Sequence, residues 1–126
     1  MTGEVQTALR ELASSFPESQ LMAVEDGNGG AFVELSAVSI GQSYCPNSTW
    51  IGFHLTYQYP EVDVYPHFLD ASVHRNGGQM LGEGLGNGTW RGRPAVQVSR
   101  RTANWNRLHH NATNKLHKVI EWLRTR

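Results

Sequence analysis

The apolar residues of this chain follow a helical period at its two ends and a strand period between them, and this order restricts the fold more than any other feature. Residues 4–16 place apolar side chains at i, i+4, i+7 and i+11, namely Val5, Leu9, Leu12 and Phe16. This spacing predicts an amphipathic helix, which ends at Pro17 because proline lacks an N–H and restricts the residue before it. Residues 111–124 predict a second helix, whose apolar face consists of Ala112, Leu116, Val119, Ile120 and Leu123.

Four segments between the predicted helices have strand character. Residues 21–25 and 31–40 are apolar and flank a glycine-rich turn, while residues 50–57 and 64–73 carry aromatic and alternating apolar side chains. Short connections join successive segments, which favours antiparallel pairing of neighbours. We therefore expect an α+β fold in which a four-stranded antiparallel meander lies between an N-terminal and a C-terminal helix.

Glycine dominates the segment that follows the fourth predicted strand. Residues 75–93 contain seven glycines and few apolar residues, a composition that raises the entropy cost of ordering the backbone. We expect a long, flexible loop over residues 77–93 rather than a helix or a strand. The segment does not resemble a phosphate-binding loop, because no Gly-Lys-Ser/Thr follows the glycines.

Length and composition indicate one domain over residues 1–126, since the chain has room for a single core. No apolar run approaches the roughly 18 residues of a membrane span. The first ten residues lack the basic start and apolar core of a signal peptide, so we expect a cytoplasmic protein. The only cysteine, Cys45, excludes an internal disulfide framework and a zinc finger. The histidines lack zinc-ligand spacing, and we expect neither a metal nor another cofactor.

The charge of the chain is divided between its two parts. Residues 1–74 hold one base, Arg10, and nine acids, whereas residues 75–126 hold ten bases and only two acids. A formal net charge of zero therefore conceals a bipolar distribution. The basic part favours an acidic protein or a nucleic acid as a partner, although the charges of both parts also serve to solvate the surface.

Three short motifs resemble those of a single enzyme family, the ubiquitin-conjugating enzymes. Tyr59-Pro60 and Tyr65-Pro66 resemble the family's YPxxPP segment, His74-Arg75-Asn76 resembles its HPN tripeptide, and Trp105-Asn106 resembles its W-S/T-P stretch. Residues 97–105 (QVSRRTANW) are most similar to bacterial ubiquitin-conjugating-like proteins. Those are encoded beside activating enzymes, ubiquitin-like proteins and deubiquitinase-like peptidases, in conjugation or defence clusters. The resemblance spans residues 57–123 and implies a ubiquitin-conjugating-like, RWD-like fold.

The resemblance also places the family's catalytic cysteine about eight residues before the tryptophan, where this chain has Gln97. An amide cannot carry a thioester, because transfer needs a thiolate nucleophile and leaving group. The resemblance therefore implies a non-catalytic module that binds a ubiquitin-like protein, an activating enzyme or a conjugating subunit. Its degenerate active-site region would consist of His74, Asn76, Gln97, Ser99, Arg100 and Trp105, and its partner-binding residues of Tyr59, Pro60, Tyr65, Pro66 and Arg101.

Two other functions remain open. In an antiparallel meander, the loop between the second and third strands lies at the same end as the exit of the fourth, so Cys45 can approach His74 and serve as the thioester nucleophile of an active conjugating enzyme. Alternatively, the basic part can bind nucleic acid. The residues for this role are Arg91, Arg93, Arg100, Arg101 and Arg107, interleaved with Trp90 and Trp105.

Overall fold

The computed structural model describes all residues from 1 to 126 and confirms both predicted helices. Helix α1 spans Gly3–Ser15, and the side chain of Thr2 caps its start by accepting from Val5 N. Helix α2 spans Ala112–Arg124 and begins with a capping box in which Asn111 and Asn114 each accept from the other's backbone N–H. Such caps satisfy the first N–H groups of a helix and fix its start. Neither helix has the length and apolar character of a membrane span.

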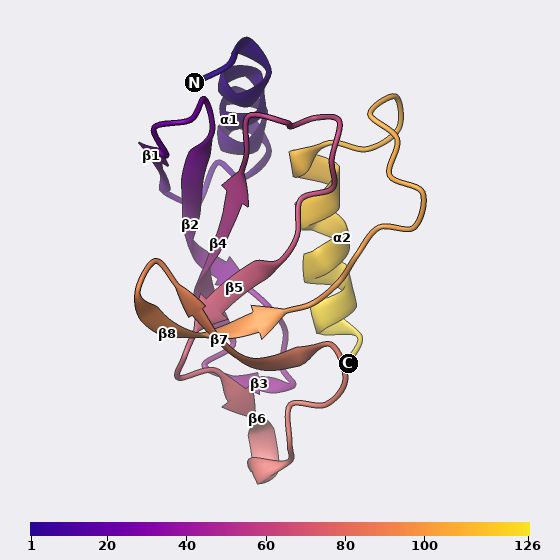
Figure 1. Ribbon diagram of the computed structural model, residues 1–126. Helices are drawn as coiled ribbons and strands as arrows, with labels where there is room; N and C mark the ends of the chain where they lie inside the picture. Colours follow the sequence, from indigo (N-terminus) through magenta and orange to yellow (C-terminus); the bar gives the residue numbers. More distant parts are fainter.

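The sheet lies between the two helices in the sequence, as expected for an α+β fold. Four antiparallel neighbours form the meander: β1 (Leu21–Glu25), β2 (Ala31–Ser39), β4 (Ser48–Leu55) and β5 (His67–Asp70). Two more strands, β8 (Arg93–Val98) and β7 (Leu85–Trp90), extend the sheet beyond β5, giving the order β1-β2-β4-β5-β8-β7. Figure 1 shows this sheet with α2 standing beside β4 and β5.

The predicted strand count of four is too low for two reasons. The first is a separate two-stranded ladder of β3 (Tyr44–Cys45) and β6 (His74–Arg75), followed by a 3-10 turn at Asn76–Gly78. The second is the β7–β8 hairpin, which occupies much of the segment 77–93 that we expected to be a loop. Strands of two residues give no periodic signal, which explains the first omission.

Glycine in the β7–β8 hairpin supports regular structure instead of preventing it. Arg91 and Gly92 form the two-residue turn, and both have positive φ, 50° and 82°, as a type I′ hairpin turn requires. Gly88 lies where a Cβ would stand 2.9 Å from the Gln97 side chain. The expectation of a loop over residues 77–93 was therefore wrong from Leu85 onward, because these glycines meet geometric needs of a hairpin.

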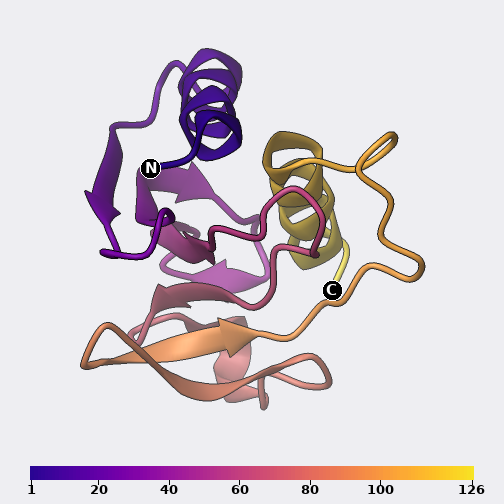
Figure 2. The same cartoon turned by 45° about the horizontal axis from the view of Figure 1, so that its top comes forward.

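Both helices cover the same face of the sheet, and Figure 2 shows them side by side above it. The core between the layers combines α1 and α2 side chains with the inward-facing residues of the strands; its largest fully buried members include Leu12, Leu35, Ile51, Phe53, Leu69, Leu116 and Leu123. On the opposite face, Trp90 lies against Gly52 and donates from Nε1 to Glu34 at 3.1 Å. The Trp90 side chain thus covers part of the face of the sheet that carries no helix.

A buried ammonium group holds the long connection between β8 and α2. Lys115 Nζ donates to Asp63 Oδ1 at 2.9 Å, to the Arg100 carbonyl at 2.8 Å and to Thr102 Oγ1 at 2.7 Å. Burial lowers the pKa of Lys115, and the Asp63 carboxylate opposes that shift. Further along, Trp105 Nε1 donates to the Pro60 carbonyl at 2.8 Å. The connection has little regular structure, so these bonds fix its course.

We expect Lys115→Ala to lower the free energy of unfolding by about 3 kcal/mol, because the partners of a largely buried charge would lose their donor. Lys118→Ala is the matched control, since Lys118 is an exposed lysine on the same helix, and we expect a change of at most about 0.5 kcal/mol. Urea unfolding followed by circular dichroism measures both. Equal losses in the two variants would contradict a structural role for the buried ammonium.

Candidate functional site

The structure gathers several of the predicted partner-binding residues at the N-terminal end of α2. Tyr59 is buried, and its hydroxyl accepts from Ala112 N at 2.9 Å. Pro60 is bound through its carbonyl to Trp105. Arg101 lies over the Tyr65 ring, with its guanidinium carbon 4.0 Å from the ring centre. These residues, predicted from separate motifs, therefore form one region.

His74 and Asn76 lie at the other end of α2. Asn76 donates from Nδ2 to Gln42 O at 2.5 Å and from its backbone N to Ser43 O at 3.0 Å, while Ser43 Oγ donates to Arg126 O at 2.9 Å. Helix α2 has 13 residues and so is about 20 Å long. The six residues grouped by the resemblance are thus not one site: Asn76 supports the β2–β3 loop at one end of α2, and Trp105 lies at the other.

Gln97 occupies the position at which the resemblance places the cysteine. It lies in β8, paired with Phe68 on β5 and Gly86 on β7. Its Nε2 donates to Ser99 Oγ at 3.3 Å, and Ser99 itself is exposed. Neither side chain offers an activated nucleophile, because no histidine or carboxylate is hydrogen-bonded to either.

Cys45 and His74 are brought together, as the strand order predicts. They are directly opposed in the β3–β6 ladder, and Cys45 is exposed. The His74 ring bonds through Nδ1 to the Ser72 carbonyl at 2.9 Å, an arrangement that assigns the proton to Nδ1 and leaves Nε2 as an acceptor. No hydrogen bond joins the imidazole to the thiol.

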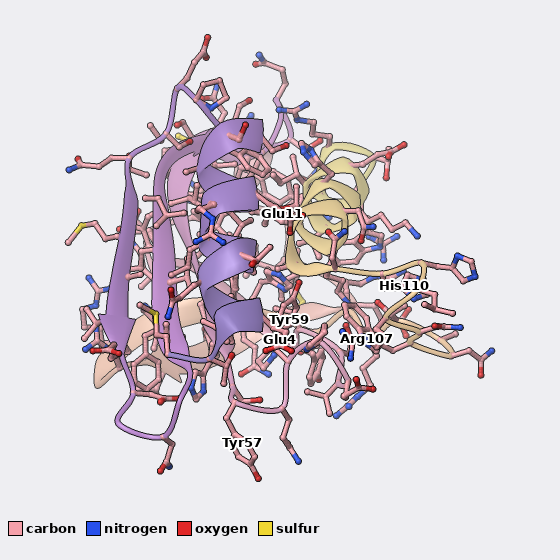
Figure 3. All side chains as sticks on the ribbon, turned by 90° about the horizontal axis from the view of Figure 1, so that it is seen from above. Glu4, Glu11, Tyr57, Tyr59, Arg107 and His110 are labelled. Carbon is pink, nitrogen blue, oxygen red and sulfur yellow. The ribbon has the colours of Figure 1, made fainter.

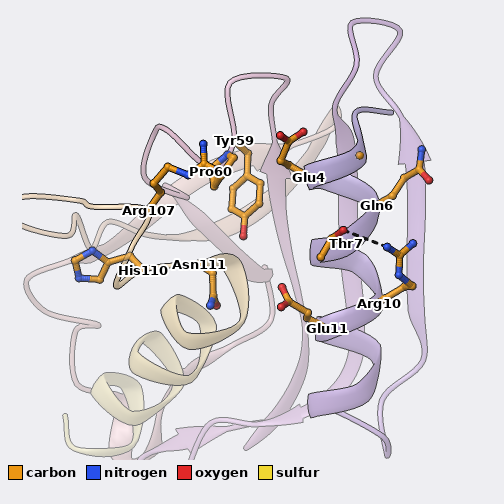
Figure 4. Close-up of a pocket in the computed structure, with 11 residues that line it drawn as sticks. Glu4, Gln6, Thr7, Arg10, Glu11, Tyr59, Pro60, Arg107, His110 and Asn111 are labelled. Atoms are coloured by element: carbon orange, nitrogen blue, oxygen red, sulfur yellow. Dashed lines mark hydrogen bonds between the residues drawn. The ribbon is translucent and has the colours of Figure 1, made fainter.

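A cleft of about 560 Å³ separates the start of α1 from the connection before α2. Figure 4 shows Glu4 and Glu11 of α1 on one wall, Arg107 and His110 on the other, and Tyr59 between them. Figure 3 shows the same residues from above, with Glu4 and Glu11 on α1 and Arg107 and His110 across from them. Most of the lining residues are polar or charged, so the cleft suits a charged group of a partner better than an apolar ligand.

The two walls of the cleft differ in how their charges are satisfied. Glu4 and Glu11 form no ion pair, whereas Arg107 is paired with Glu61 outside the cleft. His110 stacks on Trp105 and accepts from Asn106 N at 2.9 Å. Burial raises the pKa of the Tyr59 phenol, and the Glu11 carboxylate adds to the rise. The α1 wall therefore carries two carboxylates without an ion pair, together with Arg10, whereas the charged groups of the opposite wall make internal contacts.

A second hollow, which we call the basic groove, lies between residues 100–103 and α2 and has a volume of about 300 Å³. Its charged lining is entirely cationic and consists of Arg100, Arg101, Lys115 and Lys118. Trp122 lies under two guanidinium groups, Arg100 at 4.8 Å and Arg126 at 4.3 Å from its ring centre. His110 lines both the basic groove and the cleft.

Sequence reasoning found the arginines of this groove but missed Lys118 and Trp122. These two residues stand four apart on α2, a spacing that places side chains next to each other on a helix. That spacing, beside the apolar stripe and within the basic part of the chain, is the signal that would have identified them. Glu4 and Glu11 carried no comparable signal, because charged residues normally occupy the exposed face of a helix.

His67 is the one fully buried histidine of the protein. It lies in β5 against Phe53, and neither ring nitrogen has a hydrogen-bond partner. Burial lowers its pKa to about 3, with Lys115 contributing in the same direction. The ring is therefore a neutral core residue at pH 7. No three His, Cys, Asp and Glu side chains anywhere in the protein are grouped closely enough to hold a metal ion.

Comparison of the chain with protein-family models, with curated proteins and with solved structures gives no match. The resemblance of its motifs to those of ubiquitin-conjugating enzymes therefore supports a proposed function and not a family assignment. The basic groove and the cleft supply the physical observations on which that proposal depends.

We expect His67 to make the protein acid-sensitive. Between about pH 6.5 and about pH 4 the unfolded chain binds a proton at this histidine and the folded chain does not, so stability falls with decreasing pH by about 1.4 kcal/mol per unit from this group. Urea unfolding of the parent and of His67→Leu at several pH values tests this. The variant should show a shallower slope below pH 6.5, and identical slopes would contradict the assignment.

Proposed function

We propose that this protein is a non-catalytic interaction module with a ubiquitin-conjugating-like fold, which binds an acidic segment of a partner protein in the basic groove. The observation that carries the proposal is the lining of that groove, where every charged side chain is a base. A carboxylate-rich segment would meet Arg100, Arg101 and Lys118 without repulsion. The partner class suggested by the motifs is a ubiquitin-like protein, its activating enzyme or a conjugating subunit of a bacterial conjugation or defence system.

The arginines of the groove are already oriented for such a partner. Arg100 rests on Trp122 and Arg101 on Tyr65, at 4.8 Å and 4.0 Å from the ring centres. An arginine stacked on a ring keeps its planar N–H groups available for carboxylate oxygens, and less side-chain entropy is lost on binding. Lys118 adds an exposed, adaptable charge beside them.

The same stacking favours a protein over a nucleic acid. Sequence-independent binding of single strands relies on aromatic faces on which bases stack. Here each aromatic ring near the groove already has a stacking partner: Arg100 and Arg126 lie over Trp122, Arg101 over Tyr65, and His110 is stacked on Trp105. A nucleic acid would therefore find phosphate-binding charge but few free rings.

The residue at the expected position of the catalytic cysteine, Gln97, supports a non-catalytic role. Gln97 stands in a strand with neighbours on both sides, and its amide is bonded to Ser99. The motif residues His74 and Asn76 lie at the far end of α2 from Trp105 and support a loop through Gln42. An oxyanion-stabilising amide acts only when it is aimed at the reacting carbonyl, and here Asn76 is committed elsewhere.

We expect the double variant Arg101→Glu/Lys118→Glu to weaken binding of a fluorescein-labelled polyglutamate peptide at least tenfold, because two attractive contacts become repulsive. Fluorescence anisotropy at physiological salt measures the affinity. The matched control is Arg10→Glu/Arg91→Glu, which changes the net charge equally but lies outside the groove. Equal losses in the two double variants would show that net charge, and not the groove, determines binding.

A single-stranded DNA oligonucleotide of the same charge, measured under the same conditions, distinguishes the partner classes. The proposal expects the peptide to bind more tightly than the DNA. Tighter DNA binding with a steep salt dependence, lost in the groove variant, would replace the proposal with nucleic-acid binding.

A second candidate function is favoured by the pairing of Cys45 with His74 across the β3–β6 ladder. In this alternative the exposed thiol carries a ubiquitin-like protein as a thioester, and the imidazole acts as its base. His74 has an acceptor nitrogen that is free to take the thiol proton. The missing feature is a hydrogen bond between the two groups.

We expect iodoacetamide to modify Cys45 at the same rate in the parent protein and in His74→Ala, because the imidazole is not bonded to the thiol. The rate is measured by intact-protein mass spectrometry at several pH values, with His109→Ala as the control for a distant exposed histidine. A rate that is well above that of free cysteine and falls only in His74→Ala would favour the enzyme.

A further inference from the structure

Strand β1 forms an open edge of the six-stranded sheet. It is the first strand in the sheet order, and Figures 1 and 2 show no element beyond its outer side. Asp26 N donates to Gly30 O and Ser36 N to Gln20 O, each at 3.1 Å, so even-numbered residues of this strand face β2. Because bonded and non-bonded positions alternate in an antiparallel pair, Leu21, Ala23 and Glu25 direct their N–H and C=O groups outward.

Glu25 is the only charge on this edge, which otherwise lacks the features with which proteins usually protect such strands. Its five residues, Leu-Met-Ala-Val-Glu, include no proline and no lysine, and the pairing with β2 is free of bulges. Met22 is 61 % exposed and Val24 45 % exposed. Both point to the face of the sheet that the helices leave uncovered, because they pair with Glu34 and Phe32 of β2. The strand is therefore apolar, accessible and ready to pair.

We propose that β1 pairs with β1 of a second copy of this chain, antiparallel, about a two-fold axis at Ala23. In this register Ala23 opposes Ala23 of the second copy and Leu21 opposes Glu25. The outward N–H and C=O groups of all three residues then exchange hydrogen bonds. Met22 lies against Val24 of the second copy, so that each exposed apolar side chain covers the other. The two sheets become continuous.

The symmetry of the edge argues for a second copy over a foreign strand. The two exposed apolar residues, Met22 and Val24, stand at equal distances on either side of Ala23, so a two-fold axis matches each to the other without any further partner sequence. Charge is compatible with the same register. Glu25 already pairs with the N-terminal ammonium at 2.9 Å, and four residues of strand, about 13 Å, separate the two Glu25 positions, more than a Debye length at physiological salt.

A pair of short strands buries less area than a typical stable dimer interface. We therefore expect reversible association that depends on protein concentration. The basic groove lies beside residues 100–103, which follow β8, and three strands separate β8 from β1 in the sheet. Both copies of the dimer therefore keep their grooves open. This inference does not depend on what the groove binds.

Sedimentation equilibrium of the parent chain over a wide concentration range tests the proposal. The mass should rise from monomer toward dimer, and Ala23→Pro and Val24→Lys should remain monomeric. Proline removes the outward N–H of Ala23 without breaking a bond to β2, and circular dichroism verifies that each variant is folded. Leu108→Lys, at an apolar residue that is 82 % exposed away from the edge, should associate like the parent.

The register is tested separately in a Cys45→Ser background. Ala23→Cys should form a disulfide-linked dimer on mild oxidation, because this position opposes itself, and Met22→Cys should do so far less. A parent chain that stays monomeric at the highest concentration would overturn the proposal. Undiminished association of Ala23→Pro, or preferred cross-linking of Met22→Cys, would overturn it as well.

Discussion

The C-terminal half of this protein depends on the hydrogen bonds and the ion pair that the Lys115 ammonium group makes. Between the end of β8 and the start of α2 the chain has little regular structure, and such a segment has few backbone bonds of its own. Lys115 ties it to Asp63, in the connection between β4 and β5, through one charge with several acceptors. The Arg100 carbonyl is one of these acceptors, so Lys115 holds the backbone that carries Arg100 and Arg101. The basic groove is thus built around a cation that is itself largely removed from solvent.

The sequence was informative where one periodic pattern extends over many residues. Both helices and the four strands of the meander follow from the spacing of apolar residues, and the opposition of Cys45 and His74 follows from the order of those strands. The β7–β8 hairpin was missed, because the glycines were interpreted only as raising the entropy cost of ordering the backbone. Gly92 supplies a turn and Gly88 leaves space for Gln97, and neither need is visible before the strands are paired.

The candidate site was harder to predict than the fold. Short motifs placed His74 and Trp105 in one functional region, yet a whole helix separates them, because closeness in a family pattern does not guarantee closeness in space. The basic groove instead combines residues of α2 with residues of the preceding connection. Lys118 and Trp122 become meaningful only when α2 is docked and its side faces the arginines. A charge count indicated a basic half but could not indicate which bases would share a hollow.

The position of His110 links the two hollows of the surface. Its ring contacts Trp105, and the residue lines both the cleft beside α1 and the basic groove beside α2. His110 is thus a side chain that a group bound in either hollow would contact. If a group bound in the cleft changes the affinity of the groove for its ligand by some factor, the ligand of the groove changes the affinity of the cleft for its own group by the same factor. An occupant of the cleft that shifts the His110 ring would therefore also change the border of the basic groove.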